Sequence, residues 1–82
     1  MRGIRETFMT TLNLGNLATF RLVVQRGSFS AAADALGISQ PAVSLQVRQL
    51  EQFLQTRLLE RTGRGIKATA AGMALLAHSE QI

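Results

Sequence analysis

The stretch ISQPAVSLQVRQLE, residues 38–51, decides the predicted fold, because it reads as a helix with a proline near its start. In the first turn of a helix no backbone N–H needs an intrahelical acceptor, and the fixed φ of proline already suits a helix. Ser39, two residues earlier, can supply the N-cap. Pro41 therefore starts this helix rather than breaking it.

The same helix has two unlike faces when successive residues are placed about 100° apart. One narrow stripe is apolar and comprises Val43, Val47, Leu50 and Leu54. The opposite face is centred on Pro41, Ser44, Leu45, Arg48 and Gln52. We expect the stripe to pack in the core and the opposite face to be free for a partner. Leu45 lies where a solvated helix would more naturally carry a charge, which favours an apolar contact with that partner over a stray surface leucine.

A first helix is predicted from about Asn16, after a loose leader over residues 1–12 that has no helical or strand period. Apolar side chains recur there at the spacing of one buried face, namely at Leu17, Phe20 and Val24. Gly27 then stands where a left-handed cap would end the helix.

A second helix is predicted to run through SAAADAL, residues 30–36, with Ser28 as its N-cap and Gly37 at its end. Only Gly37 and Ile38 separate it from the cap of the proline-headed helix. Two helices joined by so short a turn, the second with a polar face, indicate a helix-turn-helix.

The chain after Gln55 predicts a β-hairpin, or wing. Two short apolar runs, at residues 58–59 and 66–68, flank the glycine-containing turn at residues 62–65. Between Arg57 and Lys67 there are four basic residues and one acidic residue. Arg61 and Arg64 lie at or beside the turn, so contact with nucleic-acid phosphates or a minor groove is favoured over a plain solvated hairpin.

A last helix is predicted after Thr69, its N-cap, with Met73 and Leu76 on one apolar side. That side either docks on its own domain or pairs with a second copy of the chain, and the sequence leaves both open.

Length and composition are those of one small domain, with 82 residues of which 46% are hydrophobic and 17% charged. The net charge of +4 favours a polyanionic partner but is also ordinary for a solvated surface. There is no cysteine, which fits a reducing cytoplasm, and neither a signal peptide nor a membrane-spanning stretch is expected.

No catalytic site, metal site or cofactor site is predicted. The acids are scattered and are interpreted as surface charges; they are Glu6, Asp34, Glu51, Glu60 and Glu80. The lone His78 has no partner residue, and the GRG at residues 63–65 heads no helix of a nucleotide-binding unit.

From Leu14 to about Leu76 the chain resembles the N-terminal DNA-binding domain of LysR-type transcriptional regulators. The resemblance is carried by GSFSAAA, SQPAVS, LLER and GIKATAAG. It implies a mainly α fold with a small β-hairpin, a winged helix-turn-helix over residues 13–68, and bacterial origin. Residues 69–82 would then start a linker helix that pairs two chains.

The resemblance also implies where duplex DNA would bind, because the head of the third helix enters the major groove in that family. Bases or the adjoining backbone would meet Ser39, Gln40, Pro41, Ser44 and Leu45. The Gln40 amide suits adenine, the Ser44 hydroxyl a base or phosphate, and Pro41 and Leu45 a thymine methyl group. Arg48 would meet phosphate, and Ser28 and Ser30 the backbone.

Two departures from the family pattern affect this expectation. Some members carry arginine where this chain has Leu45, so a guanine contact cannot be transferred, and the leader is longer than usual. Members continue into an effector-binding domain, which the sequence lacks, so a small-molecule effector is expected only there. Because the linker helix of this family pairs two chains, the resemblance also implies a homodimer bound to a dyad-symmetric operator.

The alternative hypothesis is a winged-helix module that uses the Leu45 face to bind another polypeptide and does not bind DNA. A protein-binding face should be more apolar at its centre and depleted in charge. The basic wing beside a face that carries glutamine and arginine therefore favours DNA.

Overall fold

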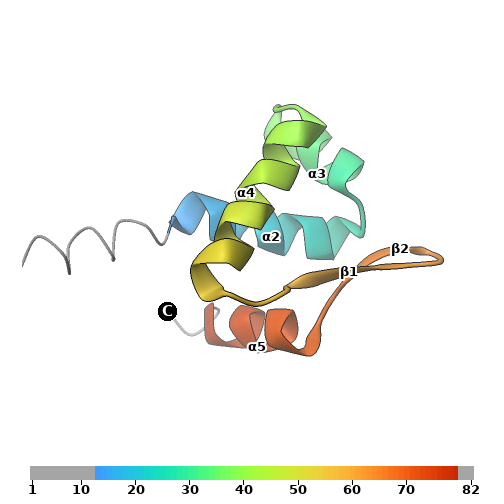
Figure 1. The fold of residues 1–82 in the computed structure, drawn as a ribbon. Coiled ribbons are helices and arrows are strands. Elements are labelled where there is room, and N and C mark those ends of the chain that lie inside the picture. The colour runs from blue at the N-terminus through green and yellow to red at the C-terminus, as the bar shows by residue number, and fades with distance from the viewer. Residues whose placement is uncertain (1–12, 80–82) are drawn as a thin grey trace, which may run out of the picture.

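The computed structural model describes residues 13–79 and confirms the mainly helical fold with a small hairpin. Three helices come first, α2 (Leu14–Arg26), α3 (Phe29–Leu36) and α4 (Gln40–Leu54). Strands β1 (Leu59–Thr62) and β2 (Gly65–Ala68) follow, and then α5 (Ala70–Ser79). The hairpin projects from the body, and α5 lies on the far side of it from α3 (Figure 1). The predicted leader lies outside the described residues.

Side-chain caps and glycines close the helices where the sequence predicts them. The Ser28 Oγ accepts from the Ala31 N–H at 3.1 Å, and the Ser39 Oγ accepts from the Ala42 N–H at 3.2 Å. Gly27 and Gly37 have φ of 69° and 70°, left-handed values that glycine adopts without strain. Short, sharply capped turns therefore set the helix-turn-helix.

The first helix starts earlier than predicted, at Leu14 rather than near Asn16. The reason is a cap at Asn13, whose side-chain oxygen accepts from the backbone N–H groups of Gly15 and Asn16 at 2.7 and 3.2 Å. Asparagine satisfies N–H groups that lack an intrahelical partner, so it can begin a helix before the apolar period does.

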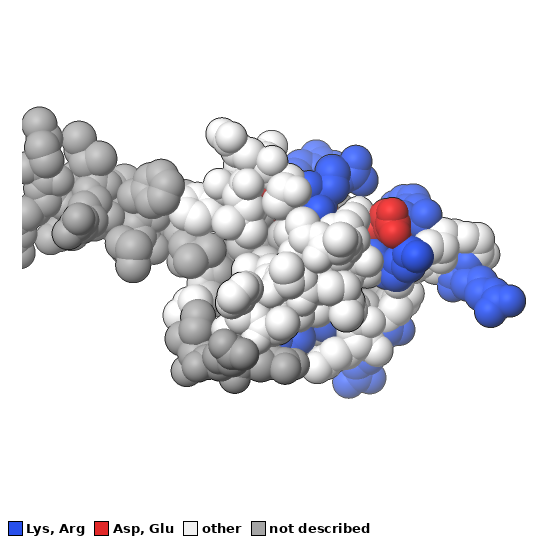
Figure 2. Space-filling model, turned by 90° about the horizontal axis from the view of Figure 1, so that it is seen from below, with Lys and Arg blue, Asp and Glu red and all other residues white. Residues whose placement is uncertain are grey.

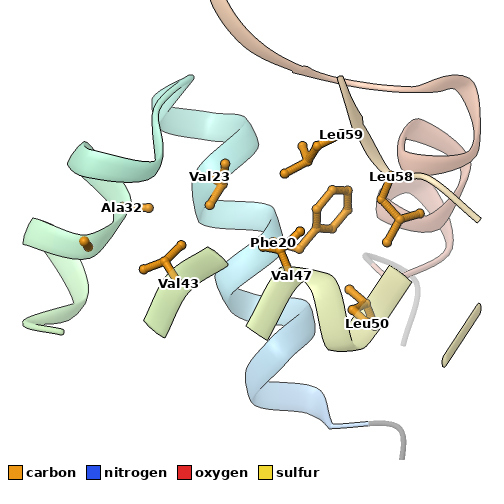
Figure 3. Packing of buried hydrophobic residues seen from close by; sticks show 9 residues of the cluster. Phe20, Val23, Ala32, Val43, Val47, Leu50, Leu58 and Leu59 are labelled. Atoms are coloured by element: carbon orange, nitrogen blue, oxygen red, sulfur yellow. The ribbon is translucent and has the colours of Figure 1, made fainter. Parts of the chain in front are cut away.

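Phe20 of α2 lies at the centre of the core, among Val47 and Leu50 of α4 and Leu58 and Leu59 at the base of the wing (Figure 3). Its side chain is fully buried, and burial of that kind contributes about 1.5–3 kcal/mol. The predicted stripe of α4 is buried at Val43, Val47 and Leu50. The prediction for Leu54 is wrong, because α4 ends there and the residue is 36% exposed.

The wing is a two-stranded antiparallel sheet in the predicted position. Leu59 pairs with Ala68 and Thr62 with Gly65, so Gly63 and Arg64 form the turn. Within β1 only Leu59 is buried, and the rest of that strand is exposed. The core therefore anchors the base of the wing, whereas its tip extends into solvent.

Thr69 caps α5, which confirms the prediction, and it also joins α5 to the base of the wing. Its Oγ1 accepts from the Gly72 N–H at 3.1 Å and donates to the Arg57 carbonyl at 2.7 Å. A Cβ at Gly72 would lie 2.3 Å from the Leu58 carbonyl oxygen. The absent side chain of Gly72 is therefore what lets α5 approach the chain that enters β1.

Candidate nucleic-acid interface

The exposed face of α4 lies opposite the buried stripe, as predicted. Gln40, Pro41 and Arg48 are exposed, Ser44 is half-buried, and Leu45 is 54% exposed. A large apolar side chain therefore stands among polar ones on a surface open to a partner.

Two polar pairs between α2 and α4 help to orient this face. The Thr19 Oγ1 donates to the Gln46 Oε1 at 2.5 Å, and the Asn16 Nδ2 donates to the Gln49 Oε1 at 3.2 Å. Asn16 and Thr19 are almost fully buried. Sequence reasoning missed both pairs, since polar residues at the margin of an apolar stripe carry no signal of their partners.

A groove of about 620 Å³ lies between α4 and the wing. Its α4 side includes Ser44, Arg48 and Gln52, and its wing side includes Arg57 and Arg61. The fold thus brings the predicted helix residues Ser44 and Arg48 to the same hollow as the predicted wing residue Arg61.

Glu51 lines this groove and corrects a prediction, because it is more than a surface charge. Its side chain is 19% exposed, and its Oε2 accepts from the backbone N–H groups of Leu58 and Leu59 at 2.8 and 3.3 Å. The Arg57 Nε lies 3.8 Å from the same oxygen. The one available signal was position, because Glu51 follows Val47 by one helical turn, at the edge of the buried stripe.

Basic side chains gather on the half of the molecule that carries the wing, around an acidic side chain (Figure 2). Arg61 and Arg64 are exposed, with Arg64 in the turn itself. Lys67 lies 3.6 Å from Glu60 across the hairpin, an exposed pair that contributes little to stability. The tip of the wing therefore presents arginines to solvent.

The three serines near the helix starts differ in their hydrogen bonding. Ser28 and Ser39 use their Oγ as acceptors for the caps of α3 and α4, and each hydroxyl keeps a proton to donate. Ser30, in the first turn of α3, is exposed.

Within residues 13–79 no group of histidine, cysteine, aspartate or glutamate residues could hold a metal ion. None of the helices in this range is both long and apolar enough to span a membrane.

Residues 14–73 match the bacterial regulatory helix-turn-helix proteins of the lysR family. The chain belongs to this family. The predicted resemblance is confirmed, and the element order is that of a LysR-type helix-turn-helix domain with a wing.

The relatives of this LysR-type domain are transcriptional regulators. It is 45% identical over 71 residues to an uncharacterized HTH-type transcriptional regulator in the ibpB-leuC intergenic region of Azotobacter vinelandii, covering 87% of this chain and 49% of that protein. The chain therefore spans about half the length of this curated relative.

Solved structures similar to the LysR-type domain include complexes with DNA. The BenM DNA-binding domain in complex with benA site 1 DNA is 39% identical, with a TM-score of 0.69, and the match covers 84% of this chain and 88% of that one. Full-length CbnR complexed with its target DNA is 42% identical, with a TM-score of 0.74, and the match covers 80% of this chain and 23% of that one.

The residues predicted for dimerisation differ in exposure in this LysR-type domain. Met73 is 58% exposed, whereas Leu76 is half-buried against the domain's own core. Arg21 of α2 also donates a hydrogen bond to the Ser79 Oγ. Of the two alternatives that the sequence left open, α5 at least docks on its own domain.

Proposed function

We propose that this chain binds duplex DNA sequence-specifically, with the head of α4 in the major groove and the wing on the flanking backbone or minor groove. One observation carries the proposal: α4 buries one face and exposes the other beside a basic wing. An exposed helix fits the major groove, and arginines bind phosphate. The BenM and CbnR complexes support the same use of the fold here.

The exposed residues at the start of α4 have the chemistry for reading bases. The Gln40 amide can donate to and accept from adenine, and the Ser44 hydroxyl can contact a base or a phosphate. Pro41 and Leu45 offer apolar surface, for which the thymine methyl group is the matching feature of the major groove. Specificity here thus depends on methyl contacts and DNA shape, without an arginine at position 45 to bind guanine.

The remaining predicted residues would position the domain on the backbone. Arg48 follows Leu45 along the exposed face of α4, and Arg61 and Arg64 belong to the wing. Ser28, Ser30 and Ser39 can donate hydroxyl protons to phosphate oxygens near the helix starts. These contacts would add affinity without carrying sequence information.

The chain is also proposed to act as a dimer on a dyad-symmetric operator in the bacterial cytoplasm. The exposed Met73 supports an α5 contact with a second copy, and Leu76 would contribute through its half-exposed edge. Two copies related by a dyad would place two α4 helices in successive major grooves. Any small-molecule effector is proposed to act through an effector-binding domain of the kind that the family resemblance implies.

The test is selection of bound duplexes from a random DNA pool by the purified chain at moderate salt, followed by sequencing. Enrichment of an inverted repeat with A/T-rich half-sites is expected. Gln40→Ala should then weaken binding to the selected site more than binding to random duplex, whereas equal losses would contradict base reading by Gln40. A folded chain that enriches no sequence would instead favour a protein-binding role for the Leu45 face.

A further inference from the structure

Glu51 connects the two parts of the proposed interface. It lies on α4 beside Gln52 and one turn after Arg48, both of which line the groove. Its Oε2 accepts from the two consecutive backbone N–H groups of Leu58 and Leu59, where the chain enters β1. The base-reading helix is thus hydrogen-bonded directly to the start of the wing.

The two hydrogen bonds of Glu51 restrict how the base of the wing can move relative to α4. Hydrogen bonds to a carboxylate are stronger than those between neutral groups, and the one from the Leu58 N–H is short at 2.8 Å, whereas the one from Leu59 is longer at 3.3 Å. The Glu51 side chain is mostly buried, so water competes weakly for it, and the side chains of Leu58 and Leu59 are buried in the core on either side of the accepted N–H groups. The segment at Leu58 and Leu59 therefore has little freedom to shift relative to α4.

The other contacts at the base of the wing lead elsewhere. Thr69 joins Arg57 and Leu58 to α5, through a donation to the Arg57 carbonyl and a backbone bond to the Leu58 carbonyl at 3.0 Å. Gly65 of β2 lies against the carbonyl of Gly27 after α2. The Glu51 hydrogen bonds, in contrast, join the base of the wing to α4 itself.

We infer that Glu51 is a positioning residue for DNA recognition, which fixes the wing relative to α4 so that both reach one duplex together. The inference rests on the proposed function. Two joined contact points gain more affinity when their separation is set before binding, because less conformational freedom is then lost on binding. Without the Glu51 bonds, α4 would still read its bases, and the wing would contribute less.

The experiment measures how much the wing adds to binding. The probe is a single half-site duplex taken from the selection, compared with the same duplex whose flanking phosphates are replaced by neutral methylphosphonates. The wild-type chain should lose about tenfold in affinity on the neutral flanks, as expected when phosphate contacts are lost. For Glu51→Ala this flank factor should shrink by about fivefold, roughly the equivalent of one hydrogen bond.

Two further variants keep the result interpretable. Glu51→Gln retains an oxygen that can accept both N–H groups, so it should restore most of the flank factor even where Glu51→Ala folds poorly. Glu60→Gln removes the same charge from the wing but leaves the Glu51 hydrogen bonds in place, so its flank factor should be at least that of wild type.

Glu51 is not a positioning residue if the Glu51→Ala and wild-type chains lose the same factor on neutral flanks, or if Glu60→Gln matches Glu51→Ala. A wild-type chain that is indifferent to the flanks would also overturn the inference, together with the proposed role of the wing. Base reading by α4 would survive that outcome, because it is measured separately by the preference for the selected half-site over random duplex.

Discussion

Hydrogen bonds between residues close in sequence stabilise the helix-turn-helix, whereas the base of the wing is held by residues of the flanking helices α4 and α5. Ser28 and Ser39 each cap a backbone N–H three residues ahead, and the turn between α3 and α4 is sealed by the Ile38 N–H on the Ala33 carbonyl at 3.1 Å. The base of the wing depends instead on Glu51 of α4 and on Thr69 and Gly72 at the start of α5. Substitutions at the local and at the long-range contacts should therefore differ in their effects on stability and on DNA binding.

The largest effect is expected from Gly72→Ala, which attacks the long-range side. The new Cβ would lie 2.3 Å from the Leu58 carbonyl oxygen and 3.1 Å from Phe20 Cζ. Backbone cannot yield as a flexible side chain does, so the free energy of unfolding should fall by about 2–4 kcal/mol despite the better helix propensity of alanine. Urea denaturation measures it.

The matched control is Gly63→Ala at the tip of the wing. Nothing lies within 4 Å of a Cβ there, and its φ is not positive. That variant should stay within about 0.5 kcal/mol of wild type. If both variants lose the same amount, the close approach of α5 does not hold the wing.

A smaller effect is expected from Ser39→Ala, which attacks the local side by removing the cap of α4. The Ala42 N–H loses its side-chain acceptor, so the free energy of unfolding should fall by about 1 kcal/mol. Ser39→Asp should restore stability, because aspartate also caps and favours a helix N-terminus. Its charge should nevertheless weaken DNA binding, which separates the cap from the proposed contact; an Asp variant that binds normally would remove Ser39 from the interface.

The smallest effect on stability is expected from Arg64→Ala, in the exposed turn of the wing. The free energy of unfolding should change by less than about 0.5 kcal/mol. Affinity for every DNA sequence should fall, and the slope of log K against log salt should become shallower by about one unit, as for a lost phosphate contact. An unchanged slope would show that Arg64 does not meet phosphate.

Much of this fold could be predicted from residues that act on their neighbours. Ser28, Ser39, Gly27 and Gly37 mark helix ends whatever surrounds them, because capping and left-handed turns are satisfied within a few residues. The exposure of Leu45 follows from the helical period of α4. The apolar period does not predict the early start of α2 at Leu14, because that start depends on the Asn13 cap.

Glu51, Gly72 and the α2–α4 pairs could not be predicted, since each meets a group distant in sequence. The sequence predicts only a surface charge at Glu51, because its acceptor role depends on where β1 begins. Leu54 has the spacing of the apolar stripe, but the spacing does not predict where the helix extends beyond the core. The wing residues Arg61 and Arg64 were identified from charge, but not the groove that Arg61 shares with Arg48.

The sequence by itself determined the helix-turn-helix, the hairpin and the face of α4 left free, because helix caps, tight turns and apolar periods act over a few residues. Tertiary structure alone decided how the wing sits against α4. A carboxylate on α4 accepts from two distant N–H groups at the base of the wing, and a missing side chain at Gly72 lets α5 approach the same segment. Both are contacts between segments whose distance in space no local pattern encodes.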